Sequence, residues 1–269
     1  MSDNRPIGVF DSGIGGLTVV KELQSLMPGE NLIYFGDTAR TPYGSRPPAE
    51  ILEFMHEILR FFSAQDVKMA VVACNTMTAI GLDAARKQYP FLMVGVNTGV
   101  RLSLMLTKNK RIGVIATQAT IASGKHGKVA KEVDPSAALY PVACPKFVPL
   151  VESGKMEGAE AEAAAREYLT PLMEAKVDTL ILGCTHYPLL ANTIRKVMGT
   201  QLTLIDPARE TAIDAHNLLK KHQLLSGARQ GATRLCFSAD LDRVKTLARC
   251  VFTGELPPVE LVNLQDFAN

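Results

Sequence analysis

The fold of this chain is decided by residues 180–188, Leu180-Ile181-Leu182-Gly183-Cys184-Thr185-His186-Tyr187-Pro188, where an apolar run leads directly into polar residues. The three apolar residues suit a buried strand, and Pro188 suits the first turn of a helix over residues 189–197. Cys184 is therefore expected in a turn at the carboxyl end of a strand. A helix N-terminus that faces such a turn stabilises a thiolate and attracts anions.

A second stretch repeats this pattern earlier in the chain. Residues 69–72 are apolar and lead into Ala73-Cys74-Asn75-Thr76, after which residues 77–89 have a helical pattern. A single Cys at a strand end is more often a small buried hydrophobe than a catalytic group. Two cysteines in matching positions favour a shared chemical function instead.

Strand-like and helical segments alternate along the whole chain. Strands are predicted near residues 7–10, 32–35, 69–73, 92–96, 112–116, 139–143, 179–182, 202–205 and 234–237. Helices are predicted near residues 17–27, 49–64, 77–89, 121–133, 158–175, 189–197, 211–221 and 241–248. This alternation predicts an α/β protein with mainly parallel sheets, in two similar doubly wound halves that each contribute one Cys turn. Ligands of such folds bind beyond the carboxyl ends of the strands.

Composition excludes several classes of protein. The 269 residues are 47% hydrophobic with a net charge of +2, and no basic block indicates nucleic acid as a primary partner. The chain starts without an apolar signal region and has no apolar run long enough for a membrane, so a cytoplasmic location is expected. The five cysteines are never spaced as C-x-x-C, which argues against a disulfide framework or a zinc knuckle. Cys144 is interpreted as structural, and Cys236 and Cys250 as ordinary buried thiols.

The loop after the first strand, Asp11-Ser12-Gly13-Ile14-Gly15-Gly16, is rich in glycine and precedes a helix. Its glycines permit positive φ or close backbone approach, so its N–H groups can hold a carboxylate or a phosphate. A dinucleotide site is disfavoured, because Thr18 occupies the third glycine position and Asp11 would lie beside a pyrophosphate. Asp11 could alternatively cap the helix that follows.

Further polar residues are expected at the same edge of the sheet. Gly36-Asp37 and Pro42-Tyr43-Gly44 follow the second strand. His186 could exchange a hydrogen bond with Cys184 or with a substrate, or could merely cap its helix. The other four histidines lie in helical patterns without clustered ligands and are interpreted as surface or packing residues: His56, His126, His216 and His222.

Taken together, these segments resemble the glutamate racemases, the cofactor-independent, cysteine-pair type of the aspartate/glutamate racemase superfamily. The resemblance covers nearly the whole chain. It is carried by Phe10-Asp11-Ser12-Gly13-Ile14-Gly15-Gly16, Tyr34-Phe35-Gly36-Asp37, Pro42-Tyr43-Gly44, Ala73-Cys74-Asn75-Thr76, Gly183-Cys184-Thr185-His186-Tyr187-Pro188-Leu189-Leu190 and the segment 144–152.

The resemblance implies a role for each matching residue. Cys74 and Cys184 would be the acid/base pair, assisted by Asp11 and His186, and Glu152 would be linked to the histidine. Substrate contacts are implied at Asp11, Ser12, Tyr43, Gly44, Asn75, Thr76, Thr117, Thr120, Thr185 and His186. No metal ligand and no cofactor are implied.

The resemblance also implies an organisation. A first domain would comprise residues 1–97 and 208–269 and a second would comprise residues 98–207, with the active site in the cleft between them. The protein would be a cytoplasmic homodimer that interconverts L- and D-glutamate and supplies D-glutamate for peptidoglycan synthesis.

The chemistry of two thiols agrees with that function, because inverting an α-carbon requires proton transfer on both of its faces. A thiol with a pKa near 8.5 can serve as acid or base. Three alternatives stay open: a racemase of aspartate or another dicarboxylate, a non-enzymatic amino-acid-binding or thiol redox-sensor protein, and a metal site. The metal site would use Cys74, Cys184, His186 and Asp11. Whether Asp11 meets the substrate ammonium or orients Cys74 is likewise open.

Overall fold

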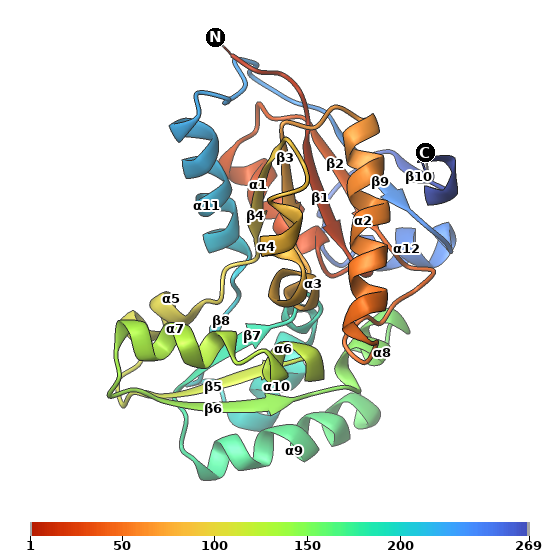
Figure 1. Cartoon of the computed structure of the whole chain (residues 1–269). Coiled ribbons are helices and arrows are strands. Elements are labelled where there is room, and N and C mark those ends of the chain that lie inside the picture. The colour runs from red at the N-terminus through yellow and green to blue at the C-terminus, as the bar shows by residue number, and fades with distance from the viewer. Residues whose placement is uncertain (1, 268–269) are drawn as a thin grey trace. The chain divides into compact units, whose positions relative to one another are not determined.

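The computed structural model describes residues 2–267 and divides into two compact units. Unit 1 consists of Met1–Asn97 and Ala208–Asn269, and unit 2 consists of Thr98–Pro207. Each unit is built on a sheet whose strands all pair in parallel (Figure 1). The α/β class predicted from the sequence is confirmed.

Unit 1 contains a six-stranded sheet in the order β10-β9-β2-β1-β3-β4. The strands are β1 (Ile7–Asp11), β2 (Leu32–Gly36), β3 (Met69–Val72), β4 (Leu92–Gly95), β9 (Thr233–Phe237) and β10 (Val259–Leu261). The helices are α1 (Leu17–Leu26), α2 (Pro48–Ala64), α3 (Asn75–Ile80), α4 (Leu82–Ala85), α11 (Ala208–Lys221), α12 (Leu241–Ala248) and the 3-10 helix η2 (Leu264–Phe267).

Helix α2 covers one face of this sheet, and α1 and α11 pack together on the other (Figure 1). The buried residues of α2 recur at helical spacing, as Ile51, Met55, Ile58 and Phe62 do. They join Phe10 of β1 in one hydrophobic cluster, in which the Phe62 and Phe10 rings meet edge to face. β1 is buried along its whole length, as expected of a strand with helices on both faces.

Unit 2 contains a four-stranded sheet in the order β6-β5-β7-β8. The strands are β5 (Arg111–Ala116), β6 (Ala138–Ala143), β7 (Thr179–Gly183) and β8 (Thr203–Ile205). The helices are α5 (Val100–Leu106), α6 (Gln118–Ala122), α7 (Lys125–Val133), α8 (Phe147–Glu152), α9 (Ala159–Glu174), the 3-10 helix η1 (Tyr187–Leu190) and α10 (Ala191–Met198). Helices α5 and α7 lie on one side of the sheet, and α9 and α10 lie on the other (Figure 1).

Three helices predicted as continuous are interrupted in the structure. Residues 77–89 form α3 and α4, with a break at Gly81, where an added Cβ would lie 2.6 Å from the Met55 sulfur. Residues 121–133 form α6 and α7, separated at Gly124, which has a φ of +64°. The helix expected at residues 189–197 starts as the 3-10 turn η1. Apolar periodicity continues across such breaks and therefore conceals them.

Other elements were absent from the sequence prediction. Helices α5 and α8 and strand β10 have seven, six and three residues, too short for a periodic pattern to be distinctive. The interpretation of Cys250 as a buried thiol was wrong, because its side chain is exposed just after α12, whereas Cys236 is buried in β9. Among residues 2–267, no helix has both the length and the apolar character needed to cross a membrane.

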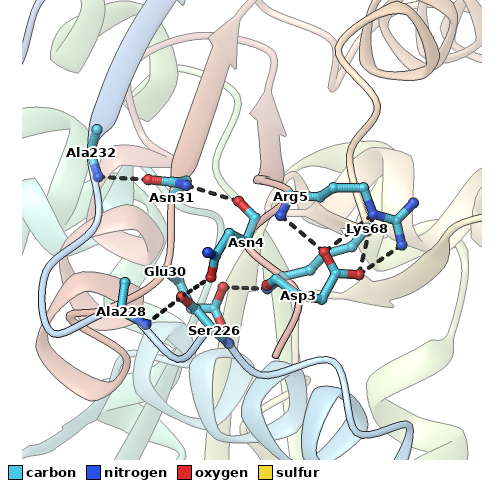
Figure 2. Close-up of polar contacts among 9 residues, drawn as sticks. All are labelled: Asp3, Asn4, Arg5, Glu30, Asn31, Lys68, Ser226, Ala228 and Ala232. Atoms are coloured by element: carbon cyan, nitrogen blue, oxygen red, sulfur yellow. Dashed lines mark hydrogen bonds and ion pairs between the residues drawn. The ribbon is translucent and has the colours of Figure 1, made fainter. Parts of the chain in front are cut away.

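An ion pair between Lys68 and Glu30 lies at the amino ends of the strands of unit 1 (Figure 2). The Lys68 Nζ and Glu30 Oε2 atoms are 2.5 Å apart, and the two side chains are 0% and 2% exposed. Lys68 also donates to the carbonyl of Asp3, and Glu30 accepts from the N–H of Ser226 at 2.7 Å. The pair thus holds the N-terminal segment and the loop before β9 against this end of the sheet.

Candidate active site

In unit 1, the carboxyl end of β1 leads into a tightly packed glycine loop. Asp11 is fully buried, and its Oδ2 accepts a 2.7 Å hydrogen bond from the N–H of Gly16. An added Cβ on Gly16 would lie 2.7 Å from the Asp11 Cβ, so this position requires glycine for close approach. None of the loop glycines has a positive φ. Because Asp11 occupies an N–H group at the start of α1, a phosphate could not use that group, which further disfavours a dinucleotide.

Cys74 lies at the carboxyl end of β3, the strand adjacent to β1. The N–H of Ala73 still bonds to the carbonyl of Phe10 at 2.9 Å, and the chain then leaves the sheet. Cys74 has extended backbone angles, is 5% exposed and immediately precedes α3, whose first turn contains buried Asn75 and Thr76. The thiol therefore has the position at a helix start that the sequence predicted.

Tyr43 belongs to the same buried cluster as Cys74. Its hydroxyl donates to Asp37, which also accepts from Arg40 Nε at 2.6 Å and from Ser238 Oγ at 2.8 Å. Burial, and then the charge of Asp37, raise the pKa of Tyr43 well above its usual value, so the hydroxyl stays protonated. The Tyr43 hydroxyl donates its hydrogen bond to Asp37, and this bond fixes the loop 42–44 beside the Cys74 thiol.

The sequence interpretation did not include Asp37, Arg40 and Ser238 among the site residues. The sequence offered a reason to include Asp37, since this residue follows the second predicted strand at the edge where ligands bind. The sequence offered no reason to include Ser238. This residue follows β9, and only the order of the strands in the sheet places β9 beside β2.

In unit 2, Cys184 is the first member of a buried chain of three polar side chains. It directly follows β7, and its Sγ lies 3.8 Å from Nδ1 of His186. Nε2 of the same ring lies 2.7 Å from Oε1 of Glu152 at the end of α8. Cys184, His186 and Glu152 are 6%, 1% and 5% exposed, so solvent hardly screens their interaction.

The partners of His186 determine its charge. Burial by itself would lower the pKa of His186, but the hydrogen bonds to Cys184 and Glu152, together with their negative charges, raise it well above its usual value. An imidazolium between a thiol and a carboxylate stabilises the thiolate. The positively charged ring of His186 therefore lies beside Cys184, and the carboxylate of Glu152 holds that ring in place.

Two threonines follow β5, the strand adjacent to β7. Thr117 caps α6: its Oγ1 accepts from the N–H of Thr120 at 3.3 Å and donates to the Thr120 Oγ1 at 3.0 Å. Both are buried. They therefore lie at the same edge of the unit 2 sheet as Cys184.

Cys144 follows β6 and is fully buried. Its carbonyl accepts a 2.9 Å hydrogen bond from the hydroxyl of Tyr187, and burial strongly raises the pKa of its thiol. This thiol is therefore protonated and held within the core, in agreement with the structural interpretation.

Within each unit, the predicted site residues gather at the carboxyl ends of neighbouring strands. Unit 1 places seven of them at the end of β1 or after β1, β2 and β3: Asp11, Ser12, Tyr43, Gly44, Cys74, Asn75 and Thr76. Unit 2 places Thr117, Thr120, Cys184, Thr185 and His186 after β5 and β7, and Glu152 reaches His186 from α8. Among residues 2–267, no three His, Cys, Asp or Glu side chains are grouped so that they could hold a metal ion.

A family model described as Asp/Glu/Hydantoin racemase matches residues 10–215, which contain all of these side chains. The chain belongs to this family. It is 41% identical over 266 residues to a glutamate racemase of Thermoanaerobacter pseudethanolicus, a match that covers 98% of this chain and all of the relative. The enzyme class predicted from the sequence, an amino-acid racemase, is thereby confirmed.

Solved structures support the same assignment. A glutamate racemase isoform from Bacillus anthracis matches with a TM-score of 0.89 and 35% identity, over 96% of this chain and 97% of that one. A glutamate racemase from Francisella tularensis, solved in complex with D-glutamate, matches with a TM-score of 0.88 and 36% identity, over 98% and 99%.

Proposed function

We propose that this protein interconverts L- and D-glutamate by proton transfer at the α-carbon, with Cys74 and Cys184 acting on opposite faces. The observation that carries the proposal is the buried chain of Cys184, His186 and Glu152, matched by a second thiol at the equivalent strand end of unit 1. Similarity to glutamate racemases, one of them solved with D-glutamate, supports the choice of substrate.

The reaction is balanced without any other reactant. One cysteine, as a thiolate, removes the α-proton: a C–H bond breaks, an S–H bond forms, and the electron pair stays on the substrate carbon. The other cysteine, as a thiol, then gives its proton to the opposite face. We assign Cys184 to deprotonation of L-glutamate and Cys74 to deprotonation of D-glutamate. Each positioned acid or base contributes about 10²–10⁴-fold in rate.

The neighbouring residues have to stabilise the charges that develop. His186 holds a positive charge beside the Cys184 thiolate, and Glu152 fixes the imidazole and its charge. Buried hydroxyl, amide and backbone N–H groups bind the two substrate carboxylates, each donor being worth about 3–4 kcal/mol in the transition state. We assign this binding to Ser12, Gly44, Asn75, Thr76, Thr117, Thr120 and Thr185. Tyr43 contributes to substrate binding through the backbone of its loop, because its hydroxyl donates to Asp37 instead.

The position of Asp11 is compatible with both of the catalytic roles that the sequence left open. One carboxylate oxygen is bound to the N–H of Gly16, which fixes the side chain at the end of β1, adjacent to the strand that carries Cys74. We propose that it orients Cys74 or receives the substrate ammonium. The setting we propose is a cytoplasmic homodimer that makes D-glutamate for peptidoglycan synthesis.

Incubation with L-glutamate in deuterated water, without added cofactor and after dialysis against EDTA, tests this function. Chiral chromatography with mass spectrometry should detect D-glutamate that carries one solvent deuterium, while the remaining L-glutamate stays largely protiated at low conversion. A single shared base would label both enantiomers alike. L-Aspartate and a sample inactivated by thiol alkylation serve as controls. Faster conversion of aspartate, or activity that requires added zinc, would overturn the proposal.

A further inference from the structure

The loop between β2 and α2 contains two arginines that both bind α2 but differ in one partner. Nη1 of Arg46 lies 2.5 Å from Oε1 of Glu50, and its Nε donates to the carbonyl of Arg40 at 2.9 Å. Arg40 pairs with Glu57 of the same helix, and its Nε also donates to Oδ2 of Asp37 at 2.6 Å. Arg40 thus joins the helix to a carboxylate at the end of the sheet.

The ring of Phe54 on α2 supports both arginines and a tyrosine of the loop. The guanidinium carbon of Arg40 lies 3.9 Å from the ring centroid, a close cation–π contact, and that of Arg46 lies 5.4 Å from it. The ring centroid of Tyr43 is 5.3 Å from the same centroid. The Phe54 ring shares one face of α2 with both glutamates, because residues three and four apart are neighbours on a helix. This face of α2 therefore holds the loop through one ring and two carboxylates.

Asp37 requires a positive partner because its carboxylate is fully buried. It accepts from the Tyr43 hydroxyl and from Ser238 Oγ, and its own N–H donates to the carbonyl of Asp11 at 3.0 Å, beside the end of β1. A buried carboxylate is costly without a charged partner, and removal of that partner leaves an uncompensated charge. The Arg40 side chain, which is 23% exposed, supplies the opposite charge.

We propose that Arg40 is a positioning residue for racemisation, and that it compensates the charge of Asp37 and so holds the loop 42–44 where this loop binds the substrate. This role rests on the proposed function, which assigns a substrate carboxylate to the backbone of the loop. Arg40 acts through Asp37 and does not touch the substrate. Its loss should weaken binding of the ground state and of the transition state alike, which raises KM and leaves kcat nearly unchanged.

Steady-state racemisation by variants at the two arginines tests this role. Arg40→Met should raise the KM for both enantiomers by about tenfold, since a hydrogen bond to a charged group is lost, with kcat within about threefold of wild type. Arg46→Met is the matched control, because it loses an ion pair to α2, a cation near Phe54 and one bond to the loop, but no bond to Asp37. Its KM should change by less than about threefold.

A double variant separates an action through Asp37 from a direct contact with glutamate. In Arg40→Met/Asp37→Asn, the amide oxygen can still accept from the Tyr43 hydroxyl, whereas the charge that Arg40 compensated is gone. The KM should return to within about threefold of wild type, and this variant should fold even if Arg40→Met does not. Arg40→Lys keeps the charge, but an ammonium does not reproduce the planar fork that joins two carboxylates. Its KM should lie between those of wild type and Arg40→Met.

Three results would overturn this role of Arg40. Equal changes in KM for Arg40→Met and Arg46→Met would show that any contact between the loop and α2 suffices. A folded double variant whose KM stays well above that of wild type would mean that Arg40 binds glutamate directly. A lower apparent kcat at unchanged KM would indicate a smaller folded fraction and a purely structural role.

Calorimetric titration of the same variants with racemic glutamate distinguishes this role from the proposed function. The affinities should follow the order expected for KM, and the measurement does not depend on turnover. A wild-type protein that binds glutamate without racemising it would contradict the proposed function alone. A wild-type protein that racemises glutamate, with equal affinities in Arg40→Met and Arg46→Met, would contradict the role of Arg40 alone.

Discussion

The two cysteine turns occupy equivalent positions but have different polar partners. Cys184 is connected through His186 to Glu152, and all three side chains are nearly inaccessible to solvent. Cys74 instead lies in the apolar cluster of unit 1 with Tyr43, whose hydroxyl is turned to Asp37. The strand end determines where a thiol lies, whereas residues from other elements determine how its proton is held.

This difference makes the proposed mechanism asymmetric. A titratable imidazolium supports Cys184, and the corresponding groups near Cys74 are a carboxylate held by a backbone N–H and a tyrosine that stays protonated. Equivalent substitutions in the two turns should therefore have different consequences.

Replacement of either thiol should have the largest effect. In Cys74→Ser or Cys184→Ser, a hydroxyl with a far higher pKa takes the place of the thiol, so the loss should approach the full contribution of an acid/base group, about 10²–10⁴-fold in kcat. Racemisation in both directions is measured by circular dichroism. Cys250→Ser, at an exposed position outside the site, should retain normal activity. Near-normal turnover by a folded Cys74→Ser variant would transfer the role of base to Asp11.

The next effect should distinguish the two turns. His186→Asn removes a hydrogen bond to a charged group and should lower kcat/KM by about 10- to 100-fold. Asp11→Asn is the corresponding substitution in the Cys74 turn. The two enantiomers have equal free energies, so kcat/KM must fall equally in both directions. The asymmetry should appear in isotope effects instead.

In His186→Asn, α-deuterated L-glutamate should show a larger kinetic isotope effect than α-deuterated D-glutamate, because removal of the proton by Cys184 becomes rate-limiting. Asp11→Asn should reverse this order if Asp11 orients Cys74. Equal isotope effects in both variants would contradict separate bases on the two faces.

The sequence located the strand ends well, because a buried parallel strand is a short apolar run whose end is marked by polar residues. Asp11, Cys74, Thr117 and Cys184 each lie one or two positions after the last apolar residue of such a run. The contact between Glu152 and His186 spans 34 positions and was expected only through the family resemblance.

Partners that depend on sheet order could not be predicted from the sequence. Ser238 reaches Asp37 because β9 pairs with β2, although 201 positions separate the two residues. Likewise, periodicity predicted the helix over residues 121–133 without its break at Gly124. It indicated that His126 is a surface or packing residue, and could not show that the buried Nε2 of its ring has no hydrogen-bond partner among residues 2–267.

A smaller effect should come from the outer end of the Cys184 chain. Glu152→Gln keeps the shape of the side chain but removes a negative charge that raises the pKa of His186. The imidazolium should therefore lose its proton at lower pH, and the alkaline limb of the kcat/KM profile should move to lower pH. Activity on the acidic side should change less.

The pH profile of Glu174→Gln, an exposed glutamate at the end of α9, is the control for this charge change. An unchanged alkaline limb in Glu152→Gln would mean that His186 does not contribute to it.

The smallest effect on turnover is expected for the buried ion pair at the opposite end of the unit 1 strands. Lys68→Met leaves Glu30 as an uncompensated buried charge and removes a donor to the Asp3 carbonyl, so it should destabilise folding by about 3–5 kcal/mol. The double variant Lys68→Met/Glu30→Leu should recover much of that loss, although the bond from the Ser226 N–H is absent. Urea denaturation measures both. For the folded fraction, kcat should stay near normal, because neither side chain lies at the end of the sheet that carries Cys74. A fall in kcat comparable to that of His186→Asn would mean that a buried charge at the far end of the sheet influences the Cys74 thiol. The difference between the two cysteine turns would then not arise from their immediate polar neighbours alone.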